Sequence, residues 1–142
     1  MRGLAAAGLA LLTGLVAPER SAFAQADAES IETPATLVKV GSPVDEAVVG
    51  TVQNAALKLK RQSEDAGVRG VLVLELTPGS SRFGPVRDLA QFLTSSDLSD
   101  VRTVAWAPES LDGNNAIVAL ACEEIVLHPD AEFGDLGRGR AL

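Results

Sequence analysis

The segment that most constrains the fold is residues 70–84, GVLVLELTPGSSRFG. Its first half is apolar at nearly every position, which is typical of a strand buried on both faces of a parallel sheet. The backbone then has to turn, because Pro78 lacks an N–H and Gly79 can adopt a positive φ. A helical pattern starts at Gly84-Pro85. A strand, a loop and a helix in this order place the loop at the carboxyl edge of a sheet, where open α/β sheets bind their ligands.

The alternation of strands and helices continues through residues 36–142. Strands are expected at 36–40, 70–76, 101–107 and 125–127, the start of another within 131–134, and helices at about 43–66, 85–93 and 115–122. The first helix is expected to have Ser42 as its N-cap, Pro43 as its first residue and Gly67 as its C-terminal cap. Helices between successive strands predict an α/β fold with a mostly parallel sheet and right-handed β-α-β crossovers.

The first 24 residues have the organisation of a secretory signal peptide. Met1-Arg2 is a short basic start, residues 3–17 are apolar and uncharged, and residues 22–24, Ala-Phe-Ala, fit a cleavage site before Gln25. An uncleaved N-terminal anchor is the alternative, although the apolar run is shorter than the ~20 residues of a membrane span. Residues 25–35 are mostly polar and are predicted to form a flexible leader. We expect an exported protein, periplasmic or membrane-associated.

The charge and the scarcity of metal-binding side chains exclude several functions. Without residues 1–24 the chain holds ten basic and 18 acidic residues, a net charge of −8. An acidic chain without a basic cluster is not expected to bind nucleic acid. Cys122 and His128 are the only residues of their kinds, so neither a disulfide nor a thiolate or imidazole metal cluster is expected, and no cofactor is predicted. Cys122 is expected in the core and His128 in a solvated turn.

Two motifs together resemble Clp/crotonase-type serine peptidases, most closely the membrane-associated branch of NfeD-like and signal-peptide-peptidase-A-like proteins. The first is the buried strand that ends in Thr77-Pro78-Gly79. The second follows the strand VRTVAWA and consists of a loop, a short apolar helix and the segment EIVLHPDAEFG. The resemblance covers about residues 37–137. It implies a Clp/crotonase-like domain over residues 36–142, incomplete at the C-terminus, together with self-assembly into a homo-oligomer and membrane helices further along the chain.

The resemblance also assigns site residues. In this family a T-P-G-G motif supplies backbone N–H groups to an oxyanion hole, the serine of an S-A-G motif attacks the peptide carbonyl, and a lysine or histidine further along is the base. Gly79 matches the first oxyanion glycine, and Ser80 replaces the second. The nucleophile position falls on Gly113, which has no hydroxyl, and Asn114 follows it. His128 does not match the family's histidine. The backbone-binding residues implied are Gly79, Ser80 and Asn114, without a nucleophile.

The same residues have purely structural explanations, which the sequence leaves open. Gly79 is either an oxyanion-hole glycine or a glycine that only ends a strand. The segment 113–115, Gly-Asn-Asn, either binds a carbonyl group or caps the following helix. Ser80, Ser81 and Ser110 are alternative nucleophiles, and none has an identifiable base nearby in the sequence.

The sequence therefore predicts an exported domain related to ClpP-class peptidases that has lost catalysis. It would act in binding or assembly at the membrane, with a peptide or a membrane protein as its partner. Two alternatives stay open. One is an active serine peptidase with a relocated nucleophile and a base supplied by sequence beyond Leu142. The other is a crotonase-like domain that binds an acyl thioester.

Overall fold

The computed structural model describes residues 32–134. The predicted signal peptide, residues 1–24, and all but the last residues of the predicted leader, 25–35, lie outside the described part, as do residues 135–142. Between residues 32 and 134, no helix combines the length and the hydropathy that crossing a bilayer requires.

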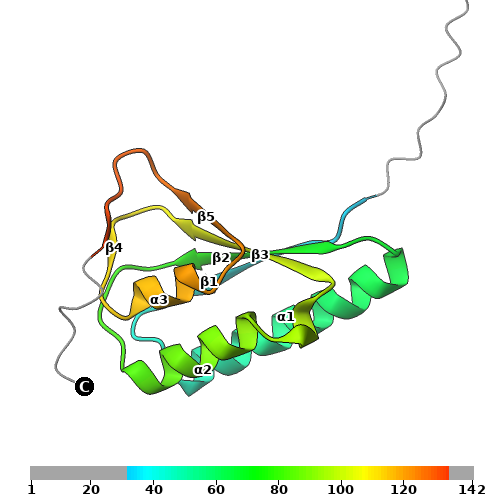
Figure 1. The fold of residues 1–142 in the computed structure, drawn as a ribbon, viewed down its shortest axis with the longest axis horizontal. Coiled ribbons are helices and arrows are strands. Elements are labelled where there is room, and N and C mark those ends of the chain that lie inside the picture. The colour runs from blue at the N-terminus through cyan, green and yellow to red at the C-terminus, as the bar shows by residue number, and fades with distance from the viewer. Residues whose placement is uncertain (1–31, 135–142) are drawn as a thin grey trace, which may run out of the picture. The chain divides into compact units, whose positions relative to one another are not determined.

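A parallel four-stranded sheet is the centre of the domain (Figure 1). Its strands lie side by side in the order β1 (Ala35–Val40), β2 (Gly70–Leu76), β3 (Val101–Ala107) and β5 (Glu124–Leu127). A smaller parallel sheet pairs β4 (Leu111–Asp112) with β6 (Phe133–Gly134). The predicted α/β class with a mostly parallel sheet is confirmed. The strand expected within 131–134 is β6, which pairs with β4 instead of extending the main sheet.

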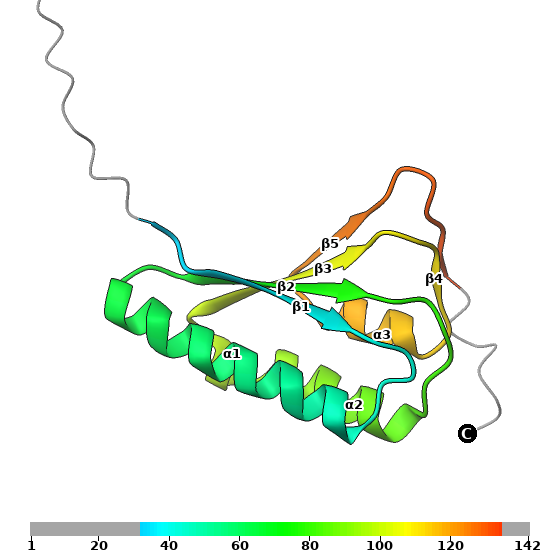
Figure 2. The same cartoon turned by 180° about the vertical axis from the view of Figure 1, so that it is seen from behind.

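Three helices connect the strands and lie on one side of the main sheet (Figure 2). They are α1 (Glu46–Ala66), α2 (Phe83–Leu93) and α3 (Asn115–Leu120), and a 3₁₀ turn at Ser96–Leu98 precedes β3. Gly67 ends α1 with φ 65° and its N–H donates to Glu64 O, as the sequence predicts for a C-terminal cap. The core lies between the helices and the sheet face that they cover, with α1 contributing Val49, Val52, Ala56 and Leu59.

Helix α1 begins later than the sequence pattern predicts. Its N-cap is Asp45, whose Oδ1 accepts the N–H three residues further on at 2.9 Å. The predicted cap Ser42 and the predicted first residue Pro43 precede the helix in a loop. The reason is that Val44 is buried and donates its N–H to Ser81 Oγ at 2.7 Å, which holds residues 41–44 in a non-helical path.

Strand β2 is buried on one face only, whereas its composition predicts burial on both. Leu72, Leu74 and Leu76 point into the core and are at most 2% exposed. Val71 and Val73 point the other way and are half-buried. Within residues 32–134 the helices cover only one face of the sheet (Figure 1). The alternating burial of β2 follows from this.

Candidate functional site at the carboxyl edge

Four loops meet at the carboxyl edge of the main sheet. They are residues 41–45 after β1, 77–82 after β2, 108–114 after β3, which include β4, and 128–132 after β5. Because the strands are parallel, all four loops leave the sheet at the same edge, where α/β sheets place their binding sites. The sequence-predicted site residues all lie in these loops, so the fold brings them to one region of the domain.

Gly79 occupies the sharpest turn of this edge. Its φ is 141°, a conformation that L side chains rarely adopt. A Cβ at this position would lie 2.2 Å from Ser42 Oγ and 2.8 Å from Ser42 Cβ, so the loop after β1 leaves no room for a side chain. The position of Ser42 therefore explains on structural grounds why residue 79 is a glycine.

The backbone donors of the same turn are also free. No hydrogen bond joins the N–H of Gly79 or of Ser80 to another residue in the described range 32–134. Gly79 is half-buried and Ser80 is exposed. Two consecutive N–H groups at the rim of the site can thus donate to a carbonyl oxygen or to an anion.

Asn115 joins the head of α3 to this turn. Its side chain is 3% exposed, and Nδ2 donates to Thr77 O and to Ser42 Oγ, each at 3.2 Å. Its Oδ1 and the hydroxyl of Thr77 are buried without a hydrogen-bond partner among the described residues. The two segments that the sequence predicts to be the halves of one site, 77–81 and 113–115, are therefore in direct contact.

Asn114 strengthens the same connection. It precedes α3, but its side chain makes no capping bond to the helix; Nδ2 donates instead to Ser81 O at 2.8 Å. Helix capping is therefore not what the Asn114 side chain does. Gly113, at the predicted nucleophile position, has φ 59°, and a Cβ there would meet nothing within 4 Å.

The alternative nucleophiles are held by backbone groups or lack a base. Ser81 is 6% exposed and its Oγ accepts the Val44 N–H, while Ser110 Oγ accepts the Glu132 N–H at 2.9 Å. Ser80 is exposed. No lysine, histidine or carboxylate side chain between residues 32 and 134 hydrogen-bonds any of these three hydroxyls.

An open cleft of about 470 Å³ lies beside these loops. It is lined by residues from the loops after β2, β3 and β5: Pro78, Pro108, Glu109, Ser110, His128, Asp130 and Ala131. Ser110 and His128 share this cleft, although nothing in the sequence links them. His128 Nδ1 accepts the Asp130 N–H at 3.3 Å, so the neutral ring carries its proton on Nε2.

The only cysteine and the acidic side chains of the described residues were candidates for a reactive thiol or a metal site. Burial raises the pKa of the Cys122 thiol to about 12, so the sulfur is an unreactive thiol at neutral pH. The side chain is partly buried and packs against the core, whereas the sequence predicts it within the core. Among residues 32–134, no three His, Cys, Asp or Glu side chains are grouped closely enough to hold a metal ion.

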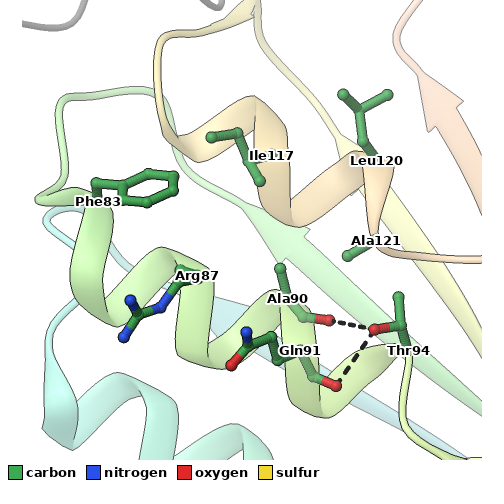
Figure 3. Close-up of a pocket in the computed structure, with 8 residues that line it drawn as sticks. All are labelled: Phe83, Arg87, Ala90, Gln91, Thr94, Ile117, Leu120 and Ala121. Atoms are coloured by element: carbon green, nitrogen blue, oxygen red, sulfur yellow. Dashed lines mark hydrogen bonds between the residues drawn. The ribbon is translucent and has the colours of Figure 1, made fainter. Parts of the chain in front are cut away.

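A second hollow, of about 310 Å³, lies between α2 and α3 (Figure 3). Phe83 and Leu120 stand exposed at its rim, and the hydroxyl of Thr94 at its far end bonds back to the carbonyl oxygens of Ala90 and Gln91. The hollow is an apolar surface groove, whereas the carboxyl edge is polar.

No protein-family model matches this chain, and no curated protein or solved structure is significantly similar to it. The resemblance to Clp/crotonase-type peptidases thus stays a prediction, and the site has to be interpreted from its own geometry. Sequence reasoning missed the roles of Ser42 and Asn115. A polar residue at the head of an apolar helix is a signal for Asn115; the sequence holds no comparable signal for Ser42.

Proposed function

We propose that this chain is an exported domain related to ClpP-class serine peptidases that has lost catalysis and binds a polypeptide partner at the carboxyl edge of its sheet. The observation that carries the proposal is the position of Asn115. Its amide links Thr77 O and Ser42 Oγ, and so joins the two segments that the resemblance implies to be the nucleophilic and oxyanion halves of a peptidase site. In the segment 113–115, where the resemblance implies a nucleophile, Gly113 has no hydroxyl and the buried Asn115 side chain holds neighbouring segments together.

The loss of catalysis follows from the requirements of acyl transfer. That reaction needs a nucleophile, a base within hydrogen-bond reach, and donors aimed at the developing oxyanion. The N–H groups of Gly79 and Ser80 are suitable donors, but Gly113 has no hydroxyl. The hydroxyls of Ser81 and Ser110 accept backbone N–H groups. Donors without a nucleophile are suited to binding a carbonyl group, not to cleaving its bond.

The charges of the cleft favour a neutral or cationic peptide. Glu109 and Asp130 line the cleft, and its lining contains no lysine or arginine. Carboxylates here would repel the phosphates of coenzyme A, so the lining of the cleft does not favour an acyl-thioester binder. A peptide backbone offers carbonyl oxygens to the free N–H groups and carries no negative charge. Export rests on residues 1–24, and association with a membrane rests on the family resemblance.

A fluorophosphonate probe tests the loss of catalysis directly. It labels serines that a base activates, and intact-protein mass spectrometry measures the label on the purified chain. We expect no stoichiometric labelling. A single probe on Ser80, Ser81 or Ser110 would overturn the proposal.

A second candidate function, an active hydrolase, is favoured by one observation: Ser110 and His128 line the same cleft. For His128 to accept the proton of Ser110 on Nδ1, that nitrogen would have to release the Asp130 N–H. Acceptance on Nε2 would require the ring proton to move to Nδ1, which breaks the same hydrogen bond. The Ser110→Ala variant, with Ser80→Ala as its matched control, decides this candidate. A hydrolysis rate that disappears only in Ser110→Ala supports the hydrolase, and identical rates in both variants exclude it.

A further inference from the structure

Asp112 and Gly113 form the only pair in the 142 residues in which glycine follows an aspartate or an asparagine. Asp112 is the last residue of β4, and Gly113 starts the short connection to α3 (Figure 1). In such a pair the main-chain nitrogen of the glycine lies next to the side-chain carboxyl group, and no Cβ shields it. Attack of this nitrogen on the carboxyl carbon closes a five-membered ring. The pair is therefore a candidate site for a modification of the main chain.

The carboxylate of Asp112 has no partner that would hold it away from this nitrogen. The side chain is exposed, and among residues 32–134 it forms no ion pair and accepts no hydrogen bond. Two other aspartates of the described range are engaged: Asp45 caps α1, and Asp88 pairs with Arg87. The carboxyl group of Asp112 can therefore turn toward the main chain.

The main chain around Gly113 is open as well. Its φ is 59°, and a Cβ built there would meet nothing within 4 Å. Strand β4 has only two residues and ends at Asp112, so the peptide group between the two residues lies at the end of the strand. Ring closure needs a rotation of this peptide group, and glycine is the residue that resists such a rotation least. The fold thus leaves room for the reaction.

We propose that Asp112 converts to isoaspartate through a succinimide, without an enzyme or a cofactor. In the first step the nitrogen of Gly113 bonds to Cγ of Asp112 in its acid form, and the carboxyl OH leaves with the amide proton as one water molecule. In the second step water adds to one of the two ring carbonyl groups and breaks its bond to the nitrogen. Opening at Cγ restores aspartate, and opening at the main-chain carbonyl carbon gives isoaspartate with the original mass. Only these two residues react, so the inference is independent of the proposed peptide binding.

Isoaspartate lengthens the main chain by one carbon atom directly before the head of α3. The next two residues connect this head to the loop after β2: Asn114 Nδ2 donates to Ser81 O, and Asn115 Nδ2 donates to Thr77 O. The added carbon displaces both amides from their acceptors, and hydrogen bonds weaken steeply when their distance and angle change. The modification therefore loosens the carboxyl edge.

Peptide mapping of aged protein tests the modification. The purified chain is kept at pH 6 and 37 °C and is then digested by a protease that cleaves after glutamate, which separates Asp112 and Asp130 into different peptides. Chromatography resolves isoaspartyl from aspartyl peptides of equal mass, and electron-transfer fragmentation locates the changed residue. We expect isoaspartate to accumulate at least tenfold faster at Asp112 than at Asp130, which is also exposed at the carboxyl edge but precedes an alanine. Equal rates at the two positions would overturn the inference.

The unfolded chain is the reference for the effect of the fold. The same incubation in guanidinium chloride gives the rate at Asp112 without any tertiary structure. Because the structure leaves the pair open, we expect the rate in the native protein to lie within about tenfold of this reference. A native rate further below the reference would show that β4 protects the pair, and the inference would be wrong.

Two substitutions of Asp112 act in opposite directions. Asp112→Glu requires a six-membered ring in place of a five-membered one, so modification at this position should disappear. Asp112→Asn forms the same succinimide with ammonia as the leaving group, so the side-chain amide should be lost on ageing. Both variants keep a polar side chain at an exposed position, and circular dichroism confirms that they are folded. A glutamate variant modified as fast as the original chain, or an asparagine variant that keeps its amide, is the contrary result.

Hydrogen exchange tests the consequence for the carboxyl edge. The N–H groups of Ala116 and Ile117 donate to the carbonyl oxygens of Gly113 and Asn114 at 3.2 and 3.0 Å. In the isomerised fraction, purified by chromatography, both amides should exchange at least tenfold faster than in the original protein. The amide of Ala56, in the middle of α1, is the control and should exchange at the same rate in both. Unchanged exchange at the head of α3 would contradict the loosening.

Discussion

The side-chain amide of Asn115 donates to the main-chain oxygen of Thr77 at 3.2 Å, and so ties the head of α3 to the end of β2. The two residues are 38 positions apart in the chain, and the same amide also reaches Ser42 Oγ in a third segment. One buried side chain therefore fixes three of the loops that form the carboxyl edge.

Asn115→Ala should destabilise the protein. The substitution leaves Thr77 O and Ser42 Oγ without this donor in a partly buried place, which costs about 1–3 kcal/mol of unfolding free energy. Urea denaturation measures the change. Asn54→Ala, at an exposed position of α1, is the control and should change stability by less than about 0.5 kcal/mol. A difference of less than that amount between the two variants would contradict the bridging role of Asn115.

Gly79→Ala should be more costly than Gly113→Ala. Both glycines have a positive φ, but a Cβ at Gly79 also meets Ser42 Oγ at 2.2 Å, whereas a Cβ at Gly113 meets nothing within 4 Å. We expect about 1 kcal/mol for Gly113→Ala, and several times as much for Gly79→Ala. Thermal or urea unfolding gives both values. In the background Ser42→Gly the clash is removed, and part of the cost of Gly79→Ala should disappear; if it does not, the contact with Ser42 is not the cause.

Ser81→Ala should lower the stability of the protein more than Ser80→Ala does. Ser81 Oγ is the acceptor of the buried Val44 N–H at 2.7 Å, so its removal should cost about 1–3 kcal/mol of stability. Ser80 is exposed, and its substitution should cost less than about 0.5 kcal/mol. Denaturation curves of both variants check this order. Equal stabilities would show that the Ser81 hydroxyl does not hold residues 41–44.

Cys122 should react slowly with thiol reagents in the folded protein. Its pKa is raised from 9.0 to about 12, chiefly by burial, so at pH 8 its thiolate is scarcer than that of an unfolded chain by roughly a thousandfold. The rate of labelling by iodoacetamide, with and without urea, measures the ratio. Comparable rates in the two conditions would contradict the burial of this thiol.

The same shift predicts a loss of stability in alkaline solution. Between pH 9.0 and 12 the folded protein keeps the Cys122 proton that the unfolded chain has lost. The unfolding free energy that comes from this group is therefore intact below pH 9 and falls by at most about 1.4 kcal/mol per pH unit above it. Cys122→Ala lacks this contribution, so its stability should decline less steeply over the same range. Parallel pH profiles would be the contrary result.

The regular elements of this fold could be predicted from local patterns. The apolar run at 70–76 and the alternation at 101–107 give β2 and β3 with their observed bounds. The stop of α1 at Gly67 also depends only on a local property, the ease with which glycine adopts the left-handed conformation. In each case the residues that decide the structure are neighbours in the sequence.

The errors arose where residues distant in the chain decide the structure. Ser42 resembles an N-cap, yet Val44 is drawn out of the helix by Ser81, 37 positions away. The apolar run of β2 predicts cover on both faces. The register shows instead that Val71 lies beside Ala35 and Arg102, and Val73 beside Leu37 and Val104, on the face without helices. The contact of Asn115 with Thr77 likewise joins residues that are far apart in the chain. No spacing in the sequence predicts such contacts, because they depend on how loops are folded against each other.

The central claim, that the carboxyl edge binds a peptide without cleaving it, is tested most directly by one titration. Protein labelled with ¹⁵N is titrated with a capped Ala-Ala-Lys-Ala-Ala peptide, and mass spectrometry follows the peptide in the same sample overnight. We expect saturable shifts of the Gly79 and Ser80 amide signals while the peptide stays intact. Amide signals that do not move, or peptide fragments that accumulate in proportion to the protein concentration, would contradict the account.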